Sequence, residues 1–215
     1  LSDWSSDVCS SDLYNRDTMY FPRVLFAALL ALLSAGTLQA GPRTVVPADL
    51  QPGDVLLQPL DCWSCTLIEE EEDSIYSHVG MVLSTTGPEI RVLEALGRVH
   101  ELPLDAFAAR TEGGQRIRVL RLRDPSVQKT FERDHSRFEA LYRSEFDGLP
   151  YDHDFLWGNR TADGKELLYC SELVARIHAE FAGYSLPLKR MHFDHNPDQW
   201  QRYFRGAPPQ GEWGL

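Results

Sequence analysis

The strongest constraint on the fold is a pair of apolar runs, residues 78–83 and 90–96, separated by the six residues STTGPE. Each run has the length of one strand, and a Gly-Pro pair interrupts the short connection between them. Such a pattern is typical of a β-hairpin, whose two strands are antiparallel neighbours. The sequence therefore predicts an antiparallel sheet that contains this hairpin.

The register of the hairpin decides which side chains meet. If the turn centres near Thr86, three pairs lie opposite one another: Val82 with Ile90, Gly80 with Val92, and His78 with Glu94. Directly opposed side chains share a face with Cβ atoms about 5 Å apart, so we expect His78 and Glu94 to touch. A surface His–Glu pair is the alternative reading, and a slip of one residue would move Glu94 to the other face.

The rest of the chain adds strands and helices to the hairpin. Further strands are predicted at 55–58, after the turn signal at 50–54, at 98–102 and at 117–123. Helical spacing marks residues 104–110, 126–146 and 170–182, with Ser126 as an N-cap and Gly183 as a C-cap. The expected fold class is α+β, an antiparallel sheet with helices packed against it.

The N-terminal region carries two segments that we separate from the fold. Residues 3–13 read DWSSDVCSSDL, which a common sequencing adapter can encode, so we interpret residues 1–13 as an adapter-derived artefact. Residues 19–40 have a basic Arg23, an apolar run at 24–33 and a small residue at Ala40, which is typical of a secretory signal peptide. The run is short for a membrane span, although an uncleaved anchor is the alternative. Residues 41–215 then form a single exported domain, periplasmic or extracellular.

Charge and cysteine content narrow the function further. A formal net charge of −11 argues against nucleic-acid partners, which bind basic surfaces. Without the artefact, three cysteines remain, and in an oxidising compartment an odd number leaves one thiol free or bridged to another chain. Cys62 and Cys65 are close enough in sequence to pair with each other, which leaves Cys170 as the unpaired cysteine.

Cys170 stands at the start of the predicted helix 170–182. Unsatisfied backbone N–H groups and the helix dipole stabilise a thiolate at that position. A buried structural cysteine is the competing interpretation. If His78 and Glu94 are paired, however, the carboxylate orients the imidazole and leaves its second nitrogen for a thiol.

Five motifs occur in a fixed order along the chain: LQPGDVLL (50–57), YSHVG (76–80), VLEALG (92–97), PYDHDF (150–155) and YCSELV (169–174). Together they resemble the YiiX/YebB-like permuted papain-like hydrolases, relatives of the NlpC-type cell-wall peptidases. In papain-like enzymes the cysteine usually precedes the histidine, whereas here His78 precedes Cys170, as in the permuted group.

The resemblance implies a permuted papain-like fold in which the sheet packs against the helix that carries the nucleophile. It implies Cys170 as nucleophile, His78 as general base and Glu94 as the orienting residue, with no cofactor. It also favours substrate-binding roles for Tyr151 and Asp152. Tyr76, in the histidine motif, is a further substrate-binding candidate. Phe155 and Trp157 extend an aromatic wall next to Tyr151 and Asp152, with ordinary loop packing as the alternative.

An oxyanion hole needs hydrogen-bond donors. The backbone N–H of Cys170 is a natural first donor. We consider Gln58, at the end of the strand 55–58, as a second donor. The alternative is that Gln58 is an ordinary polar residue at a strand end. Glu172, in the first turn of the cysteine helix, is explained by the helix dipole alone.

Other motifs compete with this reading. The CWSC sequence at 62–65 suits a local disulfide, a thiol–disulfide redox site or half of a zinc site, but no second ligand pair follows it. The acidic run 69–73 reads as a solvated loop or as an attractant for a cationic substrate. Three residues near the C-terminus suggest a metal but lack further ligands, so we expect them on the surface: His192, Asp194 and His195.

The sequence thus predicts an exported cysteine amidase or peptidase that acts on cell-wall peptide or a related small amide, without a stable membrane anchor. Two alternatives stay open. One is a lipid-directed acyl hydrolase or acyltransferase on the same scaffold, and the other is a thiol–disulfide protein that uses Cys62 and Cys65.

Overall fold

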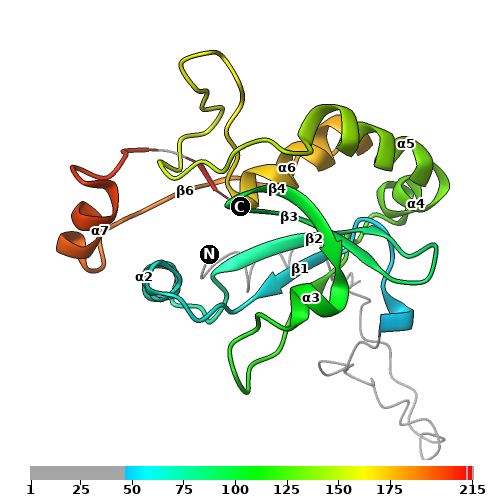
Figure 1. The fold of residues 1–215 in the computed structure, drawn as a ribbon, viewed down its shortest axis with the longest axis horizontal. Coiled ribbons are helices and arrows are strands. Elements are labelled where there is room, and N and C mark those ends of the chain that lie inside the picture. Colours follow the sequence, from blue (N-terminus) through cyan, green and yellow to red (C-terminus); the bar gives the residue numbers. More distant parts are fainter. Residues whose placement is uncertain (1–46, 212, 215) are drawn as a thin grey trace, which may run out of the picture.

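The computed structural model describes residues 47–211, 213 and 214. Five antiparallel strands form one sheet in the order β4-β3-β2-β1-β5 (Figure 1). The strands are β1 (Val55–Gln58), β2 (His78–Ser84), β3 (Arg91–Leu96), β4 (Arg98–Pro103) and β5 (Arg118–Leu120). Two short strands, β6 (Lys189–Arg190) and β7 (Trp213–Gly214), pair near the C-terminus. The antiparallel sheet predicted from the hairpin is confirmed.

The hairpin register differs from the predicted one by two residues. Glu94 pairs with Gly80 instead of His78, and Val82 pairs with Val92 instead of Ile90. The pairing shifts between Val82 and Ser84, where β2 has an irregularity of the β-bulge type, and the connecting turn is not centred on Thr86. A shift of two residues preserves the alternation of side chains, so His78 and Glu94 still share a face of the sheet.

The helices cover both faces of the sheet (Figure 1). Their bounds are α2 (Trp63–Glu71), α3 (Leu104–Ala108), α4 (Pro125–Arg133), α5 (His135–Leu141), α6 (Cys170–Ala182) and α7 (Pro197–Phe204). Two shorter turns are η2 (Pro47–Asp49), a 3₁₀ helix, and η3 (Tyr142–Phe146), a π-helix. The predicted helix 170–182 is confirmed, with Gly183 in the left-handed conformation at its end.

The predicted continuous helix 126–146 is instead three consecutive segments, α4, α5 and η3. Asp134 leaves helical geometry (φ −105°, ψ 30°) and separates α4 from α5. The N-cap is Asp124 instead of Ser126: its carboxylate accepts a hydrogen bond from the backbone N–H of Ser126 at 2.8 Å, and Pro125 takes the first helical position. The apolar spacing survives the break, because Phe131 and Phe138 both remain fully buried.

Strand alternation divides the core between the two faces. Met81 and Leu93 pack in a large cluster with Leu173 and Ile177 of α6. Val82 packs in a smaller cluster with Phe107 of α3 and other side chains on the opposite face. The sheet therefore holds α6, and Cys170 at its N-terminus, in a fixed position against β2 and β3.

His178 of α6 makes the stability of this core sensitive to acid. Its ring is fully buried, and its Nδ1–H donates to the carbonyl of Val174 at 2.8 Å, while Nε2 has no hydrogen-bond partner among the described residues. Burial lowers the pKa of His178 to about 4, against a small opposing effect of the Val174 hydrogen bond. The unfolded chain, with an ordinary histidine pKa near 6.5, then binds more protons between these two values.

We therefore expect the free energy of unfolding to fall as the pH drops from about 6.5 to about 4, by about 3 kcal/mol from this residue. His178→Leu removes the ionisable group and should flatten that part of the curve, measured by urea denaturation at successive pH values. His195→Leu, at an exposed histidine, is the matched control. The same acid slope in His178→Leu and the parent would contradict the assignment.

Among residues 47–211, 213 and 214, no helix has the length and apolar character needed to cross a membrane. The predicted adapter-derived segment 1–13 and signal peptide 19–40 lie outside the described residues, so both remain predictions.

Candidate active site

Cys170 occupies the first position of α6. Tyr169 is the N-cap in extended conformation (φ −91°, ψ 168°), and its side chain makes no capping hydrogen bond. In the described part of the chain, Cys170 is the free cysteine, and it is partly exposed. The thiol therefore lies at a helix N-terminus, where backbone N–H groups stabilise negative charge.

His78 connects this thiol to a buried carboxylate. At the first position of β2, its Nε2 lies 2.7 Å from Glu94 Oε2, and the Cys170 side chain is also a hydrogen-bond partner of the ring. Burial alone would lower the pKa of His78, but the hydrogen bonds and charges of Cys170 and Glu94 outweigh it and raise that pKa to about 9. The imidazole is thus held between a thiol and a carboxylate.

Glu94 has no exposed surface, and three side chains lie against its carboxylate. Besides His78, Arg110 Nη2 donates to Oε2 at 2.6 Å, and His100 Nε2 lies 3.2 Å from Oε1. Burial would raise the pKa of Glu94, but His78 and Arg110 lower it to about 2. Glu94 is therefore a carboxylate at neutral pH.

Sequence reasoning missed two members of this cluster. His100 lies directly opposite Glu94 in the β3–β4 pair, and the same register argument around Gly97 would have found it. Arg110 follows α3 in a loop, and no spacing rule relates that loop to Glu94.

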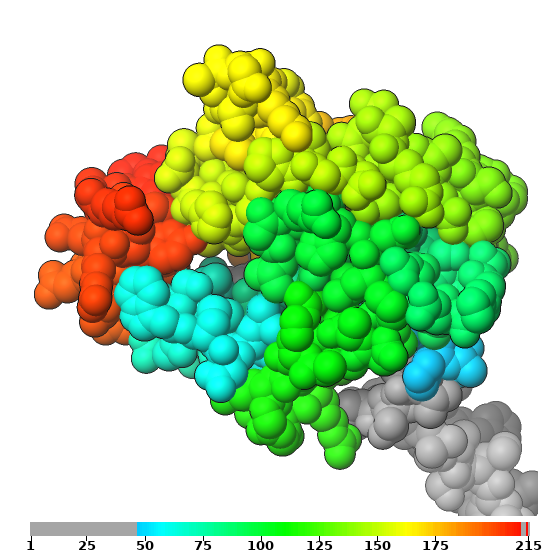
Figure 2. Space-filling view, viewed as in Figure 1, coloured from blue at the N-terminus to red at the C-terminus, as the bar shows by residue number. Residues whose placement is uncertain are grey.

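A pocket opens beside Cys170 and His78. Figure 2 shows the surface hollowed between the segment of α2 and the loop that precedes α6. The lining is largely apolar and aromatic: Leu57, Ile68, Tyr76, Val79, Tyr151, Phe155, Tyr169, Met191, Phe193 and Trp200. Polar groups besides Cys170 and His78 are Glu71, Glu72, Ser74, Ser77, Ser171 and His192.

Two of the predicted substrate-binding residues, Tyr76 and Tyr151, line this pocket. Burial, followed by the nearby charge of Cys170, raises the pKa of Tyr151 well above its usual value, so its hydroxyl stays protonated. Phe155 also lines the pocket, whereas Trp157 packs against the hydrophobic core and is absent from the lining.

Asp152 is absent from the lining of the pocket, and its substrate-binding role stays a prediction. The side chain is almost fully buried and organises the loop before α6. Its Oδ1 accepts from the backbone N–H of Asp154 at 2.9 Å and from Asn159 Nδ2 at 3.0 Å, and its Oδ2 accepts from the N–H of Leu156 at 2.8 Å. Both carboxylate oxygens are therefore engaged within this loop.

Gln58 does not act as an oxyanion-hole donor in this structure. It pairs with His78 across β1 and β2, but its side-chain Nε2 donates to the carbonyl of Phe107 at 2.5 Å and to Thr111 Oγ1 at 3.0 Å. Both donor hydrogens are thus used against α3 and the residues that follow it, and Gln58 is outside the pocket lining.

Glu172 is more than a first-turn partner of the helix dipole. Its side chain is fully buried, and Oε1 accepts from the backbone N–H of Gly158 at 2.8 Å; within the part of the chain that the structure describes, Oε2 has no hydrogen-bond partner. Burial raises the pKa of Glu172 to about 7. The residue therefore ties the loop before α6 to the cysteine helix.

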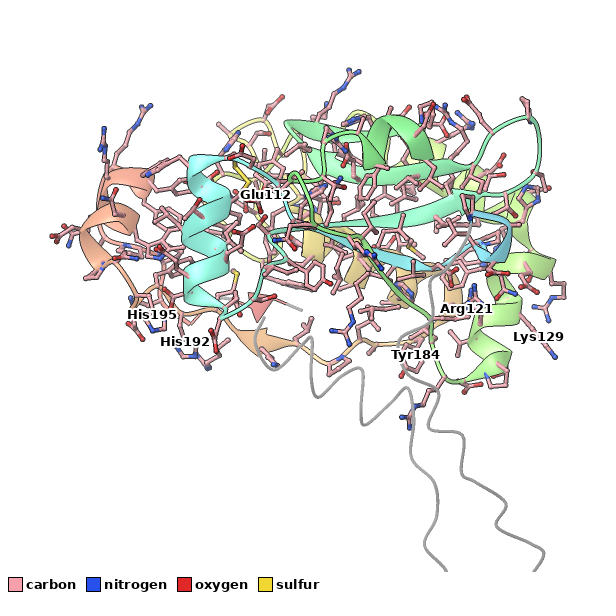
Figure 3. All side chains as sticks on the ribbon, turned by 90° about the horizontal axis from the view of Figure 1, so that it is seen from below. Glu112, Arg121, Lys129, Tyr184, His192 and His195 are labelled. Atoms are coloured by element: carbon pink, nitrogen blue, oxygen red, sulfur yellow. A yellow bond between two sulfur atoms is a disulfide. The ribbon has the colours of Figure 1, made fainter. Side chains whose placement is uncertain are left out.

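The acidic run 69–73 is not a solvated loop. It begins in α2, and Glu71 binds the C-terminal segment: it accepts from the backbone N–H groups of Asp194 and His195 at 3.0 and 2.9 Å, and from Trp200 Nε1 at 3.2 Å. His192 and His195 lie at the surface beside this junction (Figure 3). Glu71 therefore attaches to α2 the C-terminal segment that forms part of the pocket wall.

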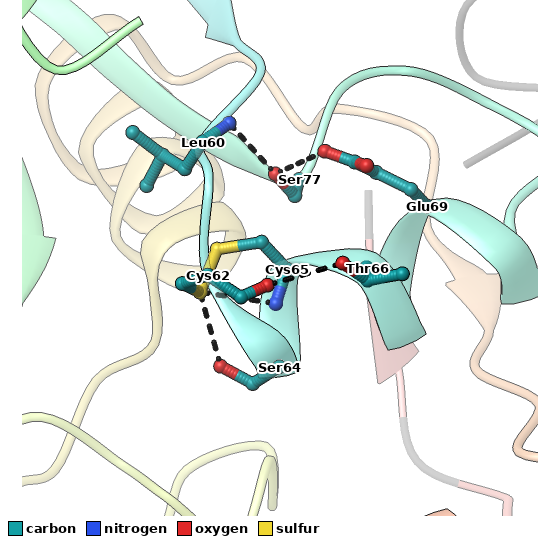
Figure 4. Close-up of a disulfide and its surroundings, with 7 residues drawn as sticks. All are labelled: Leu60, Cys62, Ser64, Cys65, Thr66, Glu69 and Ser77. Atoms are coloured by element: carbon teal, nitrogen blue, oxygen red, sulfur yellow. Dashed lines mark hydrogen bonds between the residues drawn. A yellow bond between two sulfur atoms is a disulfide. The ribbon is translucent and has the colours of Figure 1, made fainter. Parts of the chain in front are cut away.

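Cys62 and Cys65 form a disulfide at the N-terminus of α2 (Figure 4). Cys62 is the N-cap, and its Sγ accepts from the backbone N–H of Cys65 at 3.1 Å. Nearby, Ser77 links Glu69 of α2 to the backbone of Leu60. The pair therefore stiffens the start of a helix that lines the pocket. Within the described residues, no group of three or more His, Cys, Asp or Glu side chains is arranged to hold a metal ion.

A helix-borne cysteine that follows a sheet-borne histidine in the chain, on an antiparallel sheet, is the arrangement of permuted papain-like cysteine hydrolases. The family model described as "permuted papain-like amidase enzyme, YaeF/YiiX, C92 family" matches residues 49–210. The chain belongs to this family and is a cysteine hydrolase of the amidase or peptidase type.

A solved structure supports the same fold. The chain is similar to the metalloprotein YiiX of Escherichia coli O157:H7, with 25% sequence identity and a TM-score of 0.56. The match covers 77% of this chain and 88% of that chain. A comparison with curated proteins finds no match.

Gly80 provides a test of the packing around His78. A Cβ at this position would lie 2.7 Å from Phe107 Cε2 and 3.0 Å from Val92 Cγ1. Phe107 is fully buried, and its ring centroid is 6.0 Å from that of His78. An added methyl group must therefore displace the side chains that hold the imidazole.

We expect Gly80→Ala to lower the free energy of unfolding by about 1–3 kcal/mol, the usual range for overpacking, and to slow hydrolysis. Gly113→Ala is the matched control, because nothing lies within 4 Å of its added Cβ. Thermal unfolding and initial rates measure the two effects. A Gly80→Ala protein with the stability and rate of the parent would show that the ring of Phe107 is not fixed.

Proposed function

We propose that Cys170, His78 and Glu94 form the catalytic triad of an exported amidase that cleaves a small amide or peptide. The single observation that carries the proposal is that the His78 ring, paired with the buried carboxylate of Glu94 at 2.7 Å, lines the same pocket as the free thiol of Cys170. All three belong to the fixed frame of α6, β2 and β3.

The reaction proceeds through an acyl-enzyme. The Cys170 thiolate attacks the carbonyl carbon of the amide, and the His78 imidazolium protonates the departing amine as the C–N bond breaks. His78 then removes a proton from water, which attacks the thioester and releases the acid. Glu94 holds the imidazole through Nε2, which leaves Nδ1 to exchange protons with sulfur, amine and water.

Negative charge on the carbonyl oxygen needs donors. The backbone N–H of Cys170 at the start of α6 is the first, as expected from the sequence. Tyr151 is a suitable second group, because it lines the pocket next to Cys170 and keeps its proton. Tyr76 contributes to the wall that receives the substrate.

Export is supported by the signal-peptide pattern at 19–40 and by the disulfide between Cys62 and Cys65, since disulfides persist in oxidising compartments. The proposed location, periplasmic or extracellular, suits a substrate derived from cell-wall peptide.

The apolar lining of the pocket favours a second candidate, a lipid-directed acyl hydrolase or acyltransferase. On the same triad, the thioester would pass its acyl group to water or to another acceptor. The chemistry at Cys170 is unchanged, and the substrate alone distinguishes the two functions.

The test compares purified parent and Cys170→Ala proteins on muropeptides, on N-acyl amides of increasing chain length and on phospholipids, with products followed by mass spectrometry. Cleavage of muropeptides by the parent alone supports the cell-wall amidase. Cleavage that rises with acyl chain length and spares muropeptides supports the lipid-directed candidate. Equal muropeptide cleavage by both proteins would eliminate the amidase proposal.

A further inference from the structure

Glu94 is held by more than the histidine of the triad. Its Oε2 receives two hydrogen bonds, from His78 Nε2 at 2.7 Å and from Arg110 Nη2 at 2.6 Å. Its Oε1 lies 3.2 Å from His100 Nε2. Arg110 therefore binds the same oxygen that orients the imidazole.

The burial of Glu94 makes these partners consequential. A carboxylate without exposed surface keeps its charge only if cations and hydrogen-bond donors compensate for lost hydration. His78 cannot do this alone throughout a reaction in which it loses and regains a proton. Arg110 keeps its charge at every pH of interest, so its contribution does not change during turnover.

Arg110 also packs against Phe107, a neighbour of His78. Its guanidinium lies 5.5 Å from the centroid of the Phe107 ring, which also contacts the ring of His78. The side chain is 31% exposed, so the position that it occupies is open to solvent on one side. Arg110 thus extends from the surface to Glu94 Oε2, the oxygen that also contacts His78.

We propose that Arg110 is a positioning residue for the hydrolytic reaction, which fixes the Glu94 carboxylate in the orientation that holds His78 against Cys170. The inference rests on the proposed triad, because Arg110 acts through Glu94 and touches neither the thiol nor the substrate pocket. It assigns a fourth member to the site, from a loop outside the five sequence motifs.

The main test is Arg110→Met, which keeps the length of the side chain and removes its charge and donors. We expect kcat/KM to fall on the order of 10- to 100-fold, the effect of losing one hydrogen bond to a charged group. Arg110→Lys should recover part of the rate, and added methylguanidinium should partly rescue Arg110→Met through the solvent-facing side. Arg91→Met, at an arginine of β3 that pairs with Glu89 and Glu101, should retain the parental rate.

A second readout separates positioning from a structural role. With ¹³C-labelled glutamate, the Glu94 carboxyl resonance, assigned by its loss in Glu94→Gln, should titrate at a higher pH in Arg110→Met than in the parent. In a double-mutant cycle, Arg110→Met should add little further loss on the Glu94→Gln background, because the two residues act as one unit.

Parental kcat/KM in a folded Arg110→Met protein would overturn the inference. So would a loss that neither lysine nor methylguanidinium relieves and that leaves the Glu94 titration unchanged. If Glu94→Gln has no effect on the rate, the proposed triad itself fails. If Glu94→Gln is impaired while Arg110→Met is not, only the role of Arg110 is lost.

Discussion

Replacing Cys170 by alanine is expected to reduce hydrolysis by at least about a thousandfold while the protein stays folded. Removal of a catalytic nucleophile leaves only the rate that binding and the oxyanion hole supply. The thiol is partly exposed and the smaller side chain leaves α6 intact, so the melting temperature should change little. Turnover of the best substrate from the panel above and thermal unfolding give the two measurements.

The matched control is the double variant Cys62→Ser, Cys65→Ser. It removes the disulfide at the start of α2 but leaves Cys170, His78 and Glu94 in place. The hydrolase account expects this variant to keep measurable turnover. Loss of all activity in the double variant, together with parental activity in Cys170→Ala, would favour the thiol–disulfide alternative.

Replacing Glu94 by glutamine is expected to lower kcat/KM by about 10²- to 10⁴-fold, as loss of the orienting carboxylate does in other triads. The neutral amide no longer stabilises the imidazolium, and the ion pair with Arg110 is lost as well. Because Glu94 raises the pKa of His78, its removal should lower that pKa from about 9.

The alkaline limb of the pH profile of kcat/KM should therefore move to lower pH in Glu94→Gln, since the imidazolium loses its proton earlier. Glu101→Gln is the matched control. Glu101 lies on β4 and pairs with Arg91 and Arg143 instead of His78. An unchanged rate and an unmoved alkaline limb in Glu94→Gln would contradict the triad.

Much of the scaffold follows from local pattern. Two apolar runs of strand length predicted the strands of the hairpin, and the apolar stripe with Gly183 at its end predicted the bounds of α6. The predicted contact between His78 and Glu94 survived an incorrect register, because a shift of two residues keeps both side chains on one face. The face of the sheet on which a side chain lies is thus more readily predicted than the residue that lies opposite it.

The remaining features depend on tertiary contacts without a sequence period. Arg110 reaches Glu94 from a loop, and the Asp152 carboxylate turns inward and binds its own loop. Glu71 fastens a C-terminal segment that lies more than a hundred positions further along the chain. No spacing rule connects these partners, so their contacts appear only in the three-dimensional structure.

The central claim is that Cys170 is an activated thiol paired with His78. Its most direct measurement is substoichiometric alkylation with iodoacetamide at about pH 6, where an ordinary thiol is almost entirely protonated, mapped by peptide mass spectrometry. The account predicts that the label is found on Cys170 and that His78→Ala slows its incorporation. Labelling of Cys62 in preference to Cys170 would contradict this prediction, and so would a labelling rate that is the same in His78→Ala and the parent.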